Sequence, residues 1–403
     1  MNASAQRMKH IASSWREESA AFFAQHGFAG AESEAWKYSS VRTLPATLWQ
    51  NPASMPAKQM IELEAVDHYR AVLLDGVFMP SLSALPQQMQ WRAIDAPLWD
   101  VPELRADEGH RAFAQAHTTH GLVLDVPAGV ILDKPIELTH MRSVEAGNQF
   151  HASSMWAHLG AGSQAVLIER FVGGADSAMH SAHHMNYVQQ TERSSFSHYV
   201  LNDATRSDAL IHSSLVQLGS RSTYDGYAVH VGGHYTRHEV RVVMQGDHAT
   251  ASQSAIAVGQ EKQNHDLYYL TRHDAPFCTS HQHVRHMMDD ASKGVYYGRV
   301  EVPKHGVKAE AHQLHKSMLL SPKAQVMSRP ELDILTDDVV CSHGSTTGAL
   351  DAMAVYYLTA RGIDEHSAQQ MLQHAFIAQM LDAVKHDDAR AMMHNLLPMM
   401  ESL

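Results

Sequence analysis

The segment DDVVCSHGSTTGALD, near the C-terminal end, holds the residues best suited to chemistry. It carries Cys341, one of only two cysteines, and His343 two positions later. Residues i and i+2 of a strand share a face, and thiolate with imidazole is a ligand pair suited to iron, zinc or copper(I). Two ligands do not complete a four-coordinate site, so a metal here would need ligands from distant residues or from a second subunit. The alternative is structural: a buried Cys341 and a hydrogen-bonded His343 between strand and helix.

Other histidines are numerous but poorly patterned for metal binding. The chain has 31 histidines spread over nearly its whole length, which favours compositional bias as the explanation for most of them. Two sets could converge on an ion: His180, His183 and His184, and His281 with His283 on one strand face. Neither set has a cysteine or carboxylate at a supporting spacing.

Three further patterns lack the context of a known site. His238-Glu239 has no second histidine four residues on, as a metalloprotease helix requires. His312 and His315 would point to opposite faces of a strand. The run GAGSQA at 160–165 formally fits a dinucleotide fingerprint, but VLI follows it and is typical of a strand rather than a helix. We therefore interpret this run as a turn.

Signatures of the common enzyme classes are absent from the sequence. No Gly-x-x-x-x-Gly-Lys-Ser/Thr phosphate loop occurs, so the chain is not expected to hydrolyse ATP by itself. No Gly-x-Ser-x-Gly nucleophile elbow supports a catalytic triad. Adjacent carboxylates such as Asp337-Asp338 are typical of solvated turns. We predict a protein that is not an enzyme and has no catalytic residue.

Composition is that of a globular chain in a reducing compartment. Of 403 residues, 44% are apolar and 18% charged, and the formal net charge of -12 argues against nucleic-acid binding. Cys278 and Cys341 alone give no disulfide framework. The N-terminus lacks the apolar core of a signal peptide, and no uninterrupted apolar stretch of about 18 residues indicates a membrane span. We predict a cytoplasmic protein that binds neither nucleic acid nor membrane.

Hydrophobic periodicity divides the chain into three regions. Residues 1–115 are mixed and begin with an amphipathic helix that ends close to Gly27. Residues 116–345 alternate apolar and polar positions in short runs separated by turn residues, which predicts a parallel β-helix or solenoid, with a large barrel as the alternative. Residues 346–403 return to helical periodicity, with Asp364 as a predicted N-cap.

Longer blocks, together with the CSHG pattern, resemble one protein family. The blocks are HKSMLLSPKAQVMSRPELDILTDDVVCSHGSTTGALDAMAVYYLTARGID, AWKYSS, the Gly-Gly-x-x-x-Arg run at 232–237, and HDLYYLTRHDAPFCTS followed by VYYGRVEV. In this order they resemble the SufB/SufD family of iron–sulfur cluster assembly scaffolds. The SufD branch is favoured because SufB carries Glu-His-Glu where this chain has Ser342-His343-Gly344. The N-terminal cysteine cluster of many SufB chains is also absent.

The resemblance implies a fold and a set of partners. It implies a mainly β protein, with a right-handed parallel β-helix core flanked by N-terminal and C-terminal α-helical regions. A SufD chain would pair with SufB and contact the SufC ATPase through its C-terminal helices, within residues 346–403. By position, His343 matches the SufD histidine that faces a SufB cysteine across the interface, and Cys341 matches its near neighbour. The two would be metal ligands for a nascent cluster shared with SufB.

On this resemblance we expect a non-catalytic scaffold with no tightly bound cofactor. Iron or a nascent iron–sulfur cluster would be held transiently at the SufB interface, and a homodimer is a further expectation for the chain alone. Two alternatives stay open. One is a SufB-like scaffold that holds a cluster by itself. The other is a β-helical carbohydrate-active enzyme, which would need a carboxylate cluster on one face.

Overall fold

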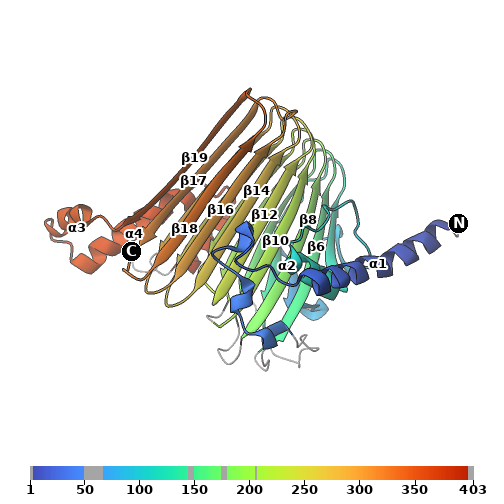
Figure 1. Cartoon of the computed structure of the whole chain (residues 1–403), viewed down its shortest axis with the longest axis horizontal. Helices are drawn as coiled ribbons and strands as arrows, with labels where there is room; N and C mark the ends of the chain where they lie inside the picture. Colours follow the sequence, from blue (N-terminus) through green and yellow to red (C-terminus); the bar gives the residue numbers. More distant parts are fainter. Residues whose placement is uncertain (1–2, 50–66, 144–148, 174–178, 205–206, 398–403) are drawn as a thin grey trace.

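The chain winds into a solenoid of parallel strands with helices at both ends (Figure 1). The predicted β-helix core with flanking helical regions is confirmed, and the barrel alternative is wrong. The structure is a computed structural model that describes residues 3–49, 67–143, 149–173, 179–204 and 207–397, with side chains from residue 15 onward.

Two sheets form the walls of the solenoid, and from β4 onward successive strands alternate between them. In spatial order, the ten-stranded sheet contains β2 (Val77–Phe78), β1 (Tyr69–Leu74), β5 (Ile136–Met141), β7 (Gln164–Val172), β9 (Ser195–Asp203), β11 (Thr223–His230), β13 (Thr250–Gly259), β15 (Thr279–Met288), β17 (Ala309–Leu319) and β19 (Val339–Ala349). The nine-stranded sheet contains β3 (Met89–Ala93), β4 (His120–Val126), β6 (Gln149–Leu159), β8 (His180–Gln190), β10 (Ala209–Leu218), β12 (Tyr235–Met244), β14 (Asn264–His273), β16 (Lys293–Val302) and β18 (Gln325–Ile334). Only the β1–β2 and β3–β4 pairs of these sheets are antiparallel.

Helices lie before, between and after the strands. The α-helices are α1 (Ala3–His26), α2 (Gly109–His117), α3 (Ala352–Thr359), α4 (Glu365–Leu381) and α5 (Asp387–Leu396), and the 3-10 turns are η1 (Glu34–Trp36), η2 (Val41–Thr43), η3 (Ala46–Trp49) and η4 (Pro80–Leu82). Gly27 follows α1 with a positive φ of 62°, as predicted for a C-terminal cap. The N-cap at Asp364 is also confirmed, because its carboxylate accepts a hydrogen bond from the Ser367 backbone N–H.

Side-chain alternation gives every strand one face inside the solenoid and one outside. Along β10, Leu210, Val216 and Leu218 join the interior core. His212 has the same parity and is also inside, fully buried. Parallel strands are normally covered on both faces. The outer faces here accordingly need cover from the terminal regions.

The helical regions cover the two outer faces separately. The N-terminal segment packs against the nine-stranded sheet through a cluster that includes Phe28, Trp36, Val41, Leu48, Phe113, Phe150, Ile211 and Tyr235. The C-terminal helices pack against the ten-stranded sheet through a cluster that includes Ile377, Leu381, Met393, Leu201, Val229 and Ile256. In Figure 1, α1 and α3 lie at opposite ends of the view.

A buried arginine fastens the N-terminal segment to β12. The guanidinium of Arg237 donates to the Asp266 carboxylate at 2.5 Å and to the Ala35 carbonyl at 3.1 Å. It also lies 3.7 Å from the ring centroid of Trp36. The AWKYSS, Gly-Gly-x-x-x-Arg and HDLYYL blocks therefore meet at this one contact.

Replacing Arg237 by Ala would leave the Asp266 carboxylate buried without its guanidinium, so we expect the free energy of unfolding to fall by about 3–5 kcal/mol. The matched control is Arg299→Ala. Arg299 pairs with Asp333 on the surface, and its side chain is 33% exposed. The free energy of unfolding of this control should fall by about 1 kcal/mol or less. Urea unfolding of both variants measures the difference; equal losses would contradict the fastening role.

Candidate metal-binding interface at the open end of the solenoid

The last turn of the solenoid has one free side. β18 pairs only with β16, and β19 pairs only with β17, so both strands are edges of their sheets. In Figure 1, β19 is the outermost strand at the C-terminal end of the stack. Within the described ranges no further strand covers this turn, and Leu335 and Val340 are each 60% exposed. Side chains that would otherwise face a closed interior are thus open to solvent or to a partner.

Cys341 and His343 lie on the same face of β19. The register pairs Cys341 with Ala311 and His343 with Gln313, and both partners are buried in the interior of the preceding turn. The thiol is half-buried, whereas His343 is exposed. Among the residues that the structure describes, the His343 side chain has no hydrogen-bond partner. The imidazole is therefore free to act as a ligand.

Hydroxyl groups, rather than further metal ligands, surround this pair. Ser345 lies two positions after His343, donates to the Ser328 hydroxyl at 2.8 Å, and has its Oγ 3.1 Å from His315 Nδ1. By alternation, the other interior positions of the described β18 and β19 add no second thiol, imidazole or carboxylate beyond Cys341 and His343. Among the described residues, the open end thus offers two side chains that could bind a metal, one thiol and one imidazole.

A family model described as SUF system FeS cluster assembly, SufBD core domain, matches residues 142–376. The chain belongs to this SufBD family. Within the family, the iron–sulfur cluster assembly protein SufD of Escherichia coli is 25% identical over 88% of this chain and 85% of its own length. A SufBD family protein of Synechocystis is 24% identical over 87% and 83%. The chloroplastic protein ABCI7 of Arabidopsis thaliana is 26% identical over 80% and 68%.

None of the helices that the structure describes is both long and apolar enough to pass through a membrane.

Strand alternation separates the three histidines of β8. His180 and His184 face the interior, while the His183 ring packs outside, 4.9 Å from that of Phe113. These three histidines therefore do not converge on one ion. His281 and His283 do share the outer face of β15, as predicted, but the His281 ring stacks on that of His312 at 5.5 Å.

Three further sequence patterns can be assigned to strand faces or turns. His312 and His315 point to opposite faces of β17, as expected, because only His315 is inside, beside His286. Likewise, His238 faces the interior and Glu239 the outside. The GAGSQA run forms the turn into β7, which begins at Gln164. That interpretation is confirmed.

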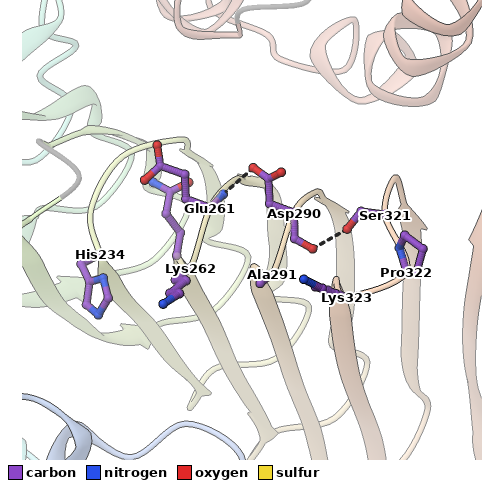
Figure 2. A pocket seen from close by; sticks show the side chains of 9 residues that line it. His234, Glu261, Lys262, Asp290, Ala291, Ser321, Pro322 and Lys323 are labelled. Carbon is purple, nitrogen blue, oxygen red and sulfur yellow. Dashed lines mark hydrogen bonds between the residues drawn. The ribbon is translucent and has the colours of Figure 1, made fainter.

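A surface groove of about 620 Å³ follows the turns on one edge of the SufBD solenoid (Figure 2). Figure 2 shows Asp290 between two neighbouring turns: its carboxylate accepts the Glu261 backbone N–H at 2.9 Å, and its carbonyl accepts the Ser321 hydroxyl. Glu261 and Asp290 both have positive φ, at 54° and 51°, so both are turn positions. The Asp290 carboxylate therefore stabilises a neighbouring turn, and Lys262 and Lys323 line the same groove.

A group of interior residues around Glu169 was not predicted from the sequence. His184, Asn186, His198 and His212 contact this carboxylate from three other strands. Local spacing does not reveal the group, because its members come from four strands and only His184 and Asn186 share one. A signal does exist at the period of the turns: His184, His212 and His238 occupy paired positions in β8, β10 and β12.

Burial raises the pKa of the Cys341 thiol above its usual value. At neutral pH the thiol is therefore protonated and must lose its proton when it binds a metal. We expect iodoacetamide to modify half-buried Cys341 in the folded protein at a rate that rises with pH beyond pH 8. Cys278, which has no exposed surface, should react only after unfolding. Mass mapping of the alkylated peptides measures both rates; faster reaction at Cys278 would contradict this assignment.

Proposed function

We propose that this chain is a non-catalytic scaffold subunit of iron–sulfur cluster assembly that pairs with a SufB subunit through the last turn of its solenoid. Membership of the SufBD family and the printed name of the Escherichia coli relative support the assembly role. The observation that carries the pairing is the open end, where Cys341 and His343 share the interior face of an edge strand that no further described strand covers. Cluster assembly of this kind would take place in the cytoplasm.

Pairing through this end has a simple physical basis. Edge strands present unpaired backbone N–H and C=O groups, which a second protein can satisfy by adding its own strands. Exposed apolar side chains beside β19, among them Leu335 and Val340, would be buried in the same step. Without SufB, a second copy of this chain can use the same edge, which supports a homodimer.

His343 is the principal ligand in this proposal, and Cys341 is the second. Iron or a nascent iron–sulfur cluster is the cargo, completed by ligands from SufB. Because this chain supplies one imidazole and one thiol at the open end, it holds the cargo only while the partner is present. A transient site of this kind suits a scaffold, which must release what is built on it.

The His343→Ala variant tests the ligand role in a complex reconstituted with SufB and SufC. We expect the yield or rate of cluster formation, read from the visible absorption of the cluster, to fall about 10-fold or more. His312→Ala is the matched control, because His312 lies on the neighbouring strand but on the outer face. Undiminished cluster formation by the His343 variant would rule out this ligand.

We further propose that α3 contacts the SufC ATPase. Within α3, Met353, Tyr356 and Tyr357 are 71%, 66% and 57% exposed. None of the residues of α3 is buried, whereas α4 and α5 bury apolar side chains against the ten-stranded sheet. An exposed apolar helix beside a packed pair is typical of a docking element. A partner ATPase would also explain a chain without a phosphate loop.

Point substitutions in α3 test this contact without disturbing α4 and α5. We expect Met353→Asp or Tyr356→Asp to weaken SufC binding by about 2 kcal/mol or more. Phe277→Asp is the control, since Phe277 is 48% exposed and lies on a turn of the solenoid rather than on α3. Isothermal titration with purified SufC gives the affinities; equal affinity for all variants would refute docking on α3.

A further inference from the structure

We propose that the interior of the solenoid holds a divalent first-row transition-metal ion, ligated by Glu169, His184, His198 and His212. This site is separate from Cys341 and His343 and does not depend on pairing with SufB. Its residues come from β7, β8, β9 and β10, so a bound ion would link four consecutive strands and both sheets.

The Glu169 carboxylate already lies close to all three imidazoles, and Glu169, His198 and His212 offer ligand atoms within 4.8 Å of one another. His184 Nε2 lies 3.0 Å from Glu169 Oε1. On the other carboxylate oxygen, Oε2, His212 Nε2 lies at 2.6 Å and His198 Nε2 at 3.2 Å. Ligands bound at about 2.0–2.1 Å around a tetrahedral ion lie about 3.3 Å from one another. A small movement of the side chains therefore makes room for the ion.

The protein does not balance the charge of Glu169 with a fixed cation. The carboxylate side chain has no exposed surface, and every ion pair it makes with a described residue is to a histidine. A buried carboxylate is costly unless a positive charge compensates it.

Hydrogen bonding leaves part of the cluster unsatisfied. Although His184 Nε2 is close to Glu169 Oε1, its hydrogen bond is made with Asn186 Oδ1 at 3.0 Å, and Oε1 has no hydrogen-bond partner among the described residues. Nδ1 of His212 also lacks a partner there. Buried polar atoms without partners are rare in native proteins and often indicate an ion or water that completes the site.

The donor set selects the class of ion. Imidazole nitrogens with one carboxylate and no thiolate suit Zn²⁺ or Fe²⁺, whereas Ca²⁺ and Mg²⁺ prefer oxygen ligands alone. His184 has a supporting contact as well, because its Nδ1 lies 2.8 Å from the Ser153 hydroxyl, an interaction that fixes the ring.

A second interior group, Asp75 with His151 and His180, is a weaker candidate. His151 Nδ1 and His180 Nε2 already hydrogen-bond to each other at 2.9 Å. The Asp75 carboxylate accepts the Ser143 backbone N–H at 3.0 Å, and its nearest imidazole nitrogen, on His180, is 3.8 Å away. His180 Nδ1 alone among these atoms lacks a hydrogen-bond partner among the described residues, whereas around Glu169 a carboxylate oxygen and an imidazole nitrogen both lack one.

Metal retention by the full chain tests the proposal, with Co²⁺ and Zn²⁺ as probes. Each protein is stripped with chelator, incubated with the ion, desalted and analysed for bound metal. We expect the wild-type chain to retain about one more ion per chain than Glu169→Gln or His198→Gln. His286→Gln is the matched control: His286 is a buried interior histidine paired with His315, outside the cluster, and its loss should leave retention unchanged.

Surface histidines will also bind some metal, so the position of the ion must be found directly. Anomalous scattering at the zinc edge from a wild-type crystal grown with Zn²⁺ locates it and does not depend on how the variants fold. A peak among Glu169, His184, His198 and His212 supports the proposal. Equal retention by wild type and Glu169→Gln, or peaks only at surface histidines or at Asp75, would overturn it. In that case the cluster is a metal-free hydrogen-bond network in which a protonated imidazole balances the carboxylate.

Discussion

Parallel pairing between neighbouring turns is the interaction on which the rest of this structure depends. Each strand from β4 to β17 has a hydrogen-bonded neighbour on both sides. Each turn of the solenoid therefore pairs the backbone groups of the turn before it. The pairing also fixes which side chains face inward, because a shift of one residue would exchange the two faces of a strand. A stack built in this way must end, and its last turn leaves β18 and β19 with unpaired edges. The candidate interface is therefore a direct consequence of the solenoid.

The two ends of the solenoid differ in how they are covered. Near the start, β3 and β4 pair antiparallel, and the N-terminal segment is fastened over the nine-stranded sheet by Arg237. At the C-terminal end α4 and α5 cover an outer face of the sheet but leave β19 open, and α3 projects with its apolar side chains exposed. The buried faces explain stability, whereas the open edge and α3 are the surfaces available for assembly. Iron–sulfur scaffolding by a member of the SufBD family would use both.

Local rules were enough to predict the features that depend on neighbouring residues. The i, i+2 spacing places Cys341 and His343 on one face, and the cap of α4 at Asp364 follows from short-range hydrogen bonding. Features set by the register between turns could not be predicted. His184 and Glu169 are 3.0 Å apart only because β7 and β8 lie in opposite walls of one interior. Periodicity also did not show that α5 packs on the sheet while α3 stays exposed, since that depends on where the chain leaves the last turn.

Hydrogen–deuterium exchange of this chain, alone and mixed with SufB, tests the central claim most directly. Unpaired edge strands exchange their amide hydrogens faster than strands paired on both sides. The account predicts that SufB slows exchange across β18 and β19, including Cys341 and His343, and leaves β8 and β10 unchanged. A stable complex in which β18 and β19 exchange as fast as in the free chain would contradict it.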